Sequence, residues 1–220
     1  IEGSFDDGQA IVKALFGDLD FKATCQLGAI NSINWARVLA QVVYYVYSSL
    51  HILKHENDKA MDFSIPTGNF GDIFAGYIAK QLLPEGTIRK LILATNANDI
   101  LCRFVNDGDY SKREVSITSS PSMDIQAASN FERYLYYLLD KNPGRTSEAM
   151  KEFSETGKLD LSNHRDQIKR DFLAASVKEE EVLETIRTFK DEYGYLLDPH
   201  TAIGVHAALS FQQKKYTHYL

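Results

Sequence analysis

The chain has 220 residues, a net charge of −6 and two cysteines, and 44% of its residues are hydrophobic. That length and composition predict a globular protein with one large domain or parts of two. The lack of a basic block argues against nucleic acid as a partner, and no apolar run approaches the ~20 residues of a membrane span. Two distant cysteines form neither a metal site nor a disulfide framework, which is typical of a reducing compartment such as the cytoplasm.

Two helices are predicted in the N-terminal part. Residues 9–16 have helical apolar spacing and end at Gly17, whereas residues 21–30 are expected to form a link. Residues 33–53 form the longest periodic helix. Its tyrosines are expected in the core: Tyr44, Tyr45 and Tyr47.

Polar side chains gather at the start of that long helix: Asn31, Ser32 and Asn34. Residues of these types cap helices by accepting hydrogen bonds from the first free N–H groups. They also suit the binding of a polar substrate, since they offer amides and a hydroxyl. The residues alone leave both roles open.

A strand, a glycine turn and a helix follow one another in the next part of the chain. Residues 63–65 are a short apolar run typical of the end of a buried strand, and Pro66 cannot donate to a strand ladder. Gly68 and Gly71 frame a tight turn, and residues 73–83 then have helical spacing. This order presents free backbone N–H groups and the positive end of a helix to an anion, often a phosphate.

Details of this turn exclude the commonest phosphate loops. It has no Gly-Lys-Ser/Thr and no third glycine, which argues against a nucleoside-triphosphate loop and a dinucleotide fingerprint. Asp72 suits a helix N-terminus, as a cap for example, but would repel a phosphate unless it pointed away. Gly68 is able to adopt a positive φ and lets a ligand approach the backbone closely, and Gly76 would let the helix lie close to a sheet. A bound phosphate and a plain structural turn both remain open.

Residues 61–94 are predicted to form a βαβ unit whose second strand is residues 89–94. The polar run 95–99 follows that strand, at the edge of the sheet where α/β proteins bind ligands. A further strand is expected at 115–119 and a further helix at 127–139.

The C-terminal third carries weaker signals. Residues 142–145 are expected to form a loop. Asp198 and Pro199 predict the start of a last helix, as cap and first residue. His200 on its first turn is interpreted as a polar helix-start residue rather than a catalyst.

Several short blocks follow one another along the chain in a recognisable order. The blocks are GSFDD at 3–7, NSINWAR at 31–37, PTGNFGD at 66–72, ATNAND at 94–99, SPSMDI at 120–125, SNFER at 129–133 and LDPHTA at 197–202. Together they resemble the threonine synthases of fungi and many bacteria. They cover most of the chain, although residues 142–192 carry none.

The resemblance implies an α/β fold of the tryptophan-synthase-β-like kind, fold type II of the pyridoxal-phosphate (PLP) enzymes. In that fold a three-layer, twisted, mostly parallel sheet belongs to two domains with the cofactor between them. Residues 1–58 would finish the smaller domain and cross over, and residues 59–220 would form most of the larger one. Because the chain starts at Ile1 without methionine, we expect an interior piece of a longer protein.

The resemblance also implies a PLP-dependent carbon–oxygen lyase that converts O-phosphohomoserine and water to threonine and phosphate. Its implied site residues are Gly68, Asn69, Phe70 and Asp72 for the cofactor, and Ser32 and Asn34 for the substrate. Asp72 is expected to accept backbone or water hydrogen bonds. The lysine that forms the Schiff base lies in a Phe-Lys-Asp context in the family, and no lysine of this chain has that setting. No catalytic residue and no metal are therefore assigned here.

Two alternative functions remain. A related phospholyase would eliminate phosphate without adding water to give threonine, and it would use the same loop. A non-catalytic α/β binding module would keep the loop and lack the lysine. Analysis of the reaction products separates the first from a threonine synthase, and a Phe-Lys-Asp sequence upstream of Ile1 would argue against the second.

Overall fold

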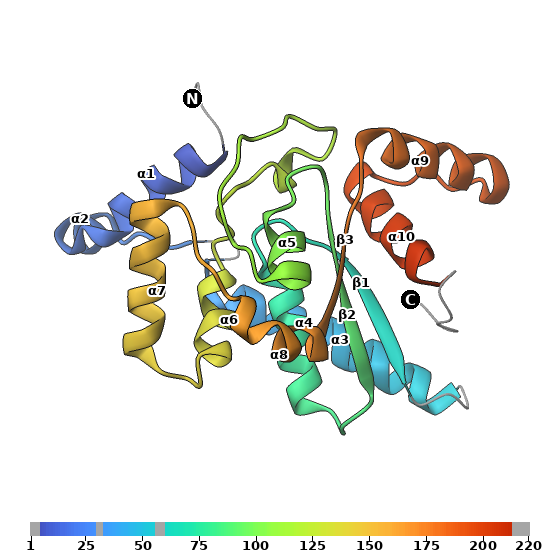
Figure 1. The fold of residues 1–220 in the computed structure, drawn as a ribbon, viewed down its shortest axis with the longest axis horizontal. Helices are drawn as coiled ribbons and strands as arrows, with labels where there is room; N and C mark the ends of the chain where they lie inside the picture. The colour runs from blue at the N-terminus through green and yellow to red at the C-terminus, as the bar shows by residue number, and fades with distance from the viewer. Residues whose placement is uncertain (1–4, 30–32, 56–59, 213–220) are drawn as a thin grey trace.

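The computed structural model describes residues 5–29, 33–55 and 60–212. At its centre lies a three-stranded parallel sheet in the order β1-β2-β3 (Figure 1). The strands are β1 (Met61–Pro66), β2 (Ile88–Thr95) and β3 (Phe172–Ser176). The predicted βαβ unit is confirmed, since β1 and β2 are parallel and the helix α4 joins them.

Helices make up most of the rest of the described chain. They are α1 (Phe5–Gly17), α2 (Leu19–Cys25), α3 (Trp35–His55), α4 (Gly71–Leu82), α5 (Ile100–Asp107), α6 (Phe131–Leu138), α7 (Pro143–Thr156), α8 (Arg165–Asp171), α9 (Glu179–Tyr193) and α10 (Pro199–Gln212), with the short 3-10 turns η1 (Pro121–Met123) and η2 (Ser162–His164). No described helix is long and apolar enough to cross a membrane.

Two segments predicted as links or loops are helical. The expected link at 21–30 contains most of α2, whose N-terminal N–H groups are capped by the Asp18 side chain. The expected loop at 142–145 is the start of α7, where the side-chain oxygen of Asn142 accepts a bond from the N–H of Arg145 at 3.1 Å. Asn followed by Pro is a cap followed by a first helical residue, the same signal that correctly predicted α10.

The sheet is buried on both faces, as the predicted three-layer arrangement requires. Successive residues of a strand point to opposite faces. Leu91 and Leu93 of β2 lie in the core shared with α3, α4, α5 and α6, whereas Ile92 and Ala94 lie in a second core formed with α9 and α10. This explains why β2 is a continuous apolar run rather than an alternating one.

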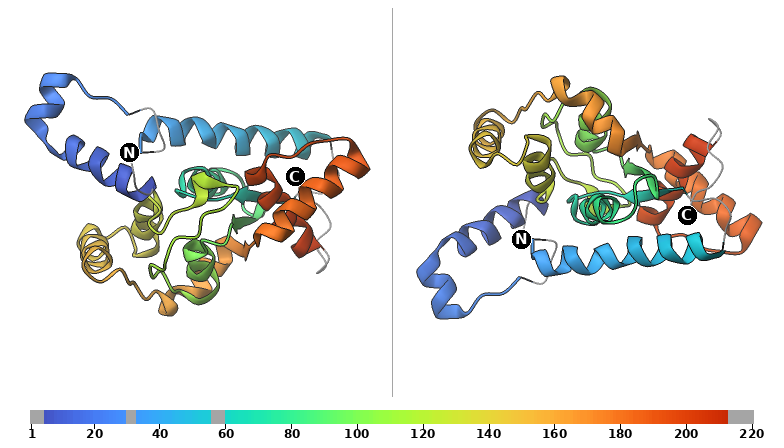
Figure 2. Two further views of the ribbon diagram at one scale, coloured as in Figure 1. Left: turned by 90° about the horizontal axis from the view of Figure 1, so that it is seen from above. Right: turned by 90° about the horizontal axis from the view of Figure 1, so that it is seen from below.

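The helix α3 packs along α4 (Figure 2), but only one of the three tyrosines predicted in the core is buried. Tyr45 is buried, with Val38 and Val42 on the same face, while Tyr44 and Tyr47 are 63% and 69% exposed. The prediction for the tyrosines is therefore correct only for Tyr45. Apolar residues occur around most of α3, so its sequence fits more than one buried stripe.

Gly76 has the predicted role of letting α4 approach the sheet. A Cβ atom at this position would lie 2.9 Å from the Tyr45 ring and 3.0 Å from a methyl carbon of Leu91. Both contacts are too close for any larger residue without movement. Gly76 thus fixes the depth at which α4, and the turn before it, lie between α3 and β2.

Candidate functional site

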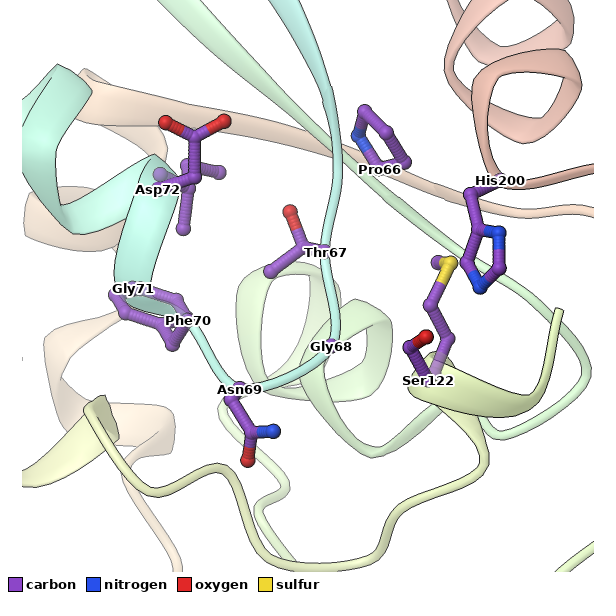
Figure 3. Close-up of a pocket in the computed structure, with 11 residues that line it drawn as sticks. Pro66, Thr67, Gly68, Asn69, Phe70, Gly71, Asp72, Ser122 and His200 are labelled. Carbon is purple, nitrogen blue, oxygen red and sulfur yellow. The ribbon is translucent and has the colours of Figure 1, made fainter. Parts of the chain in front are cut away.

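A cavity of about 230 Å³ lies at the carboxyl end of β1 (Figure 3). Residues 66–73 form one part of its wall, from the end of the strand through the turn into the first turn of α4. Ser122 and Met123 of η1 and His200 of α10 complete it. The cavity is therefore built from three segments that are far apart in the sequence.

The turn leaves a run of backbone N–H groups without acceptors among the described residues. The strand ladder ends where the N–H of Thr67 donates to the carbonyl of Ala94 at 2.8 Å. The helix begins where the N–H of Phe74 donates to the carbonyl of Phe70 at 3.1 Å. In the described part of the chain, no acceptor receives a hydrogen bond from the N–H groups of residues 68–73. Free N–H groups at the positive end of a helix are a favourable environment for an anion.

The positive φ of the turn occurs at Phe70 rather than at Gly68, where a glycine would allow it. Phe70 has φ 65° and ψ 6°, and Gly68 is not among the glycines with positive φ. Gly68 is needed for a different reason, because a Cβ there would lie 2.6 Å from the backbone oxygen of Ser122. The close approach to Gly68 is made by η1 of the same chain.

The Phe70 side chain anchors the turn in the main core. It is 1% exposed, and its ring lies about 6 Å from those of Phe131, Tyr134 and Phe172. Since these aromatic residues belong to α6 and β3, the unusual backbone at Phe70 is held by packing. Phe131 and Tyr134 lie on the buried face of α6, which forms part of the helix predicted at 127–139.

Asn69 ties the turn to other helices. Its side-chain oxygen accepts bonds from Gln9 Nε2 at 3.2 Å and from the N–H of Ser129 at 3.3 Å. Its backbone carbonyl accepts two bonds from Asn130, at 3.0 and 3.1 Å. The Asn69 side chain thus points to the opposite side of the turn from Asp72 (Figure 3), and its oxygen is used to position the loop.

Asp72 has a partner that the sequence did not predict. Its carboxylate is hydrogen-bonded to the Tyr45 hydroxyl of α3, and its Oδ1 atom is buried without a partner among the described residues. Burial raises the pKa of the Asp72 carboxyl more than the Tyr45 bond lowers it, and burial next to Asp72 raises the pKa of Tyr45 well above its ordinary value. This environment disfavours the charge of Asp72 and reduces its repulsion of an anion at the turn.

The Asp72 environment predicts a pH dependence of stability. The folded protein holds the Asp72 proton to a higher pH than the unfolded chain, where an Asp pKa is about 3.9. The unfolding free energy of the wild type, relative to Asp72→Asn, should therefore fall as pH rises above about 4 and level off above the folded-state pKa. Asparagine keeps an acceptor for Tyr45 but does not ionise. Urea denaturation over a series of pH values measures this, and a difference that stays flat or rises with pH would contradict it.

His200 is the site residue that sequence reasoning placed outside the site. The Asp198 carboxylate caps α10 by accepting from the N–H of His200 at 2.7 Å, and it also contacts His200 Nδ1 at 2.9 Å. Burial acts to raise the pKa of Asp198, but the bonds from His200 and from the N–H of Thr201 hold it below its ordinary value. The other ring nitrogen, Nε2, is buried without a hydrogen-bond partner in the described chain.

Gly204 explains why His200 reaches the cavity. A Cβ at Gly204 would lie 3.0 Å from the Pro66 ring, and the Ser64 hydroxyl donates to the Gly204 carbonyl at 2.6 Å. Residues four apart share one helix face, so His200 lies over the residues that follow Pro66. One feature of the sequence could have indicated this position of His200. It is the spacing of four residues between His200 and Gly204 in the predicted last helix.

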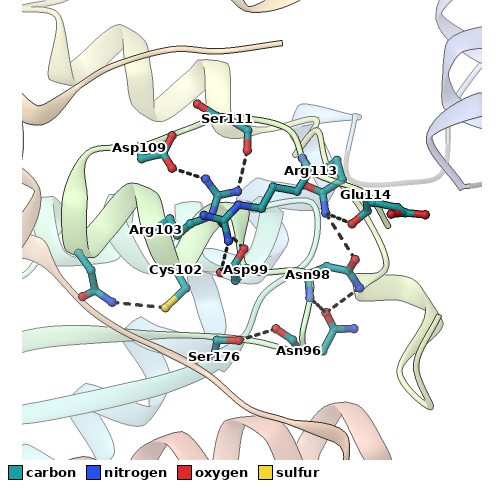
Figure 4. Close-up of polar contacts among 12 residues, drawn as sticks. Asn96, Asn98, Asp99, Cys102, Arg103, Asp109, Ser111, Arg113, Glu114 and Ser176 are labelled. Atoms are coloured by element: carbon teal, nitrogen blue, oxygen red, sulfur yellow. Dashed lines mark hydrogen bonds and ion pairs between the residues drawn. The ribbon is translucent and has the colours of Figure 1, made fainter. Parts of the chain in front are cut away.

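The polar run after β2 holds η1 in place and does not line the cavity. Figure 4 shows other contacts of this run, in which Asn96 bonds to Asn98 and Ser176. The Asn96 amide donates to Ser120 Oγ at 2.9 Å and to Asp124 Oδ1 at 2.7 Å. Asn98 accepts from the N–H of Ser116 at 2.9 Å. The strand predicted at 115–119 is absent, because this segment bonds to side chains instead of a neighbouring strand.

The two predicted substrate residues lie apart from this cavity or outside the described chain. Ser32 is outside the described residues. Asn34 caps α3, since its Oδ1 accepts from the N–H of Ala36 at 3.0 Å while its Nδ2 donates to the carbonyl of Ala29 at 2.8 Å. Among the described residues there is also no group of three or more His, Cys, Asp and Glu placed to hold a metal ion.

Comparisons with known proteins agree with this geometry. The chain is 46% identical to the threonine synthase of Pseudomonas aeruginosa over 94% of its own length and 44% of the relative's. It is 36% identical to the human protein named threonine synthase-like 1, over 97% of the chain and 30% of that protein. No protein-family profile matches the chain.

Solved structures give the same result. The PLP-bound threonine synthase of Brucella melitensis superposes with a TM-score of 0.84 and 43% identity, over 99% of this chain and 45% of that one. A threonine deaminase from T.th. shares the fold alone, with a TM-score of 0.53 and 14% identity over 83% of this chain and 54% of that one.

The parallel sheet covered on both faces, with a free turn at the carboxyl end of β1, is therefore the α/β architecture of fold type II, the fold of these PLP enzymes. Within that class, the chain is homologous to threonine synthases over nearly its whole length. It spans about half the length of the curated relatives that it matches.

Proposed function

We propose that the protein carrying this chain is a threonine synthase, converting O-phosphohomoserine and water to threonine and phosphate with PLP as cofactor. The observation that carries this proposal is the turn at 68–73, whose N–H groups have no acceptor in the described chain and face a cavity at a helix N-terminus. Homology to threonine synthases over nearly the whole chain supports the same reaction.

The residues of the turn fit a phosphate group. A phosphate needs several donors and little steric obstruction, and the N–H groups of Gly68, Asn69 and Phe70 supply donors near the positive end of α4. No lysine or arginine lines this cavity in the described chain, so the backbone would carry most of the binding. Asp72 would lie beside the group with its charge disfavoured by burial.

When bound, PLP supplies an electron sink for carbanions at the substrate's α and β carbons. The contribution of this chain is to hold the cofactor phosphate and so fix the position of the ring. The predicted Schiff-base lysine is not assigned to any residue here. Lys80, for example, is engaged with the carbonyl of Arg89 at 3.1 Å and with Asp171 at 3.0 Å.

Substrate binding by Ser32 and Asn34 stays a prediction. The substrate role of Asn34 competes with its cap, which uses both atoms of its side-chain amide. We also propose the predicted domain division, with residues 1–58 completing a smaller domain and residues 59–220 most of a larger one. A cytoplasmic location is proposed because Cys25 and Cys102 are both free thiols.

Identification of the products tests the function. The whole protein that carries this chain is supplied with PLP and O-phosphohomoserine, and the products are identified by NMR. Release of equal amounts of phosphate and threonine is expected. Phosphate release without threonine would instead indicate the related phospholyase, and no turnover would favour a binding module. The higher identity to named threonine synthases than to the human threonine synthase-like protein favours the first outcome.

A further inference from the structure

His200 carries a free ring nitrogen at the anion site. Among the described residues that line the cavity, it is the one side chain able to carry a positive charge. Its Nδ1 lies 2.9 Å from Asp198 Oδ1, and a carboxylate accepts, so Nδ1 carries a proton. Its Nε2 is buried and has no hydrogen-bond partner in the described chain. A buried polar atom without a partner costs free energy, which indicates that a ligand supplies the missing contact.

The surroundings of Nε2 favour an anionic ligand. Since Nδ1 already faces Asp198, an imidazole protonated on both nitrogens would donate from Nε2 to an anion. Gly204 against Pro66 and the bond from Ser64 to Gly204 fix the first turns of α10 against the end of β1. Figure 3 places His200 beside Ser122 and on the opposite side of the turn from Asp72. The imidazole and the free N–H groups of the turn therefore belong to one cavity.

We propose that His200 is a further binding residue of this site, contacting through Nε2 a phosphate monoester held at the turn. The phosphate belongs either to the cofactor or to the substrate, and both present the same chemistry to the imidazole. This inference rests on the proposed function. It adds a side-chain contact to a site otherwise built from backbone N–H groups.

Two substitutions separate the contact of His200 from its structural role. In His200→Asn the side-chain amide can occupy the place of Nδ1, so the bond to Asp198 and the start of α10 are retained while the Nε2 contact is lost. In His200→Gln the amide can reach the place of Nε2 and donate to a phosphate. A hydrogen bond to a charged group predicts a loss of about tenfold or more in affinity for His200→Asn. The loss for His200→Gln should be several times smaller.

The measurements use the whole protein, with and without PLP. PLP and pyridoxal, which lacks the phosphate, are titrated into the unloaded protein and followed by absorbance. Inorganic phosphate is titrated into the unloaded and PLP-loaded protein by calorimetry. If His200 contacts the cofactor phosphate, His200→Asn weakens PLP binding and leaves pyridoxal binding unchanged. If it contacts the substrate phosphate, PLP binding is unchanged and phosphate binding to the loaded protein weakens.

Other results overturn the inference. If the wild type binds PLP and His200→Asn matches it for every ligand, His200 has a structural role only and the proposed function stands. If the wild type does not bind PLP, the proposed function fails, and inorganic phosphate then decides the role of His200. Weaker phosphate binding by unloaded His200→Asn would support the contact, and equal or absent phosphate binding would overturn it.

Discussion

Replacing Gly68 with valine is expected to weaken PLP binding by the whole protein by roughly 100-fold or more, the cost of losing two hydrogen bonds to a charged group. The side chain would start 2.6 Å from the backbone oxygen of Ser122, so the turn or η1 must move. Movement of the turn misdirects the N–H groups of residues 68–73. Overpacking should also lower the free energy of unfolding by about 1–3 kcal/mol.

Gly28→Val is the matched control for Gly68→Val. No atom of the described residues lies within 4 Å of a Cβ at Gly28, so the same change there should leave PLP affinity unaltered. Titration with PLP measures both variants. Wild-type affinity in Gly68→Val would show that the turn does not hold the cofactor phosphate, even if the protein binds PLP elsewhere.

Replacing Phe70 with alanine is expected to lower the free energy of unfolding by about 3–5 kcal/mol. Its ring is 1% exposed and packs against Phe131, Tyr134 and Phe172, and its removal leaves a cavity among large, fixed rings. Because this ring holds the turn in its left-handed conformation, PLP affinity should fall with stability. Urea denaturation of the whole protein measures the first effect.

Two further variants serve as controls for Phe70→Ala. Phe70→Gly removes the same ring but relieves the positive φ of 65°, so it should be no less stable than Phe70→Ala if backbone strain matters. Tyr195→Ala removes a ring that is 64% exposed and should cost little. A loss below about 1 kcal/mol for Phe70→Ala would mean that the ring does not anchor the turn.

The parts of the site that depend on neighbours in sequence could be predicted. Residues 66–73 carry their own turn and helix signals, and α4 and β2 follow from apolar spacing. The position of positive φ could not be predicted, because Phe70 adopts it only in its aromatic surroundings. A glycine at 68 suggested backbone freedom, whereas the structure uses it for contact with Ser122.

The parts of the site that depend on contacts between distant segments could not be predicted either, because such contacts are not encoded in the neighbouring sequence. His200 comes to the cavity through contacts of Gly204 with β1, and Tyr45 meets Asp72 through the packing of α3 on α4. The strand β3 was missed because Phe172–Ser176 is a short apolar run that periodicity cannot distinguish from a helical segment. Tertiary contacts, rather than local sequence, decide each of these features.

The central claim is that this chain forms the cofactor-phosphate site of a PLP enzyme, and an absorbance titration tests it most directly. The whole protein, stripped of cofactor, is titrated with PLP and its spectrum is followed between about 300 and 500 nm. A band above about 400 nm that saturates with PLP and disappears with borohydride is the predicted result, because it reports a lysine bound to the cofactor. A spectrum identical to that of free PLP at every concentration would contradict the claim.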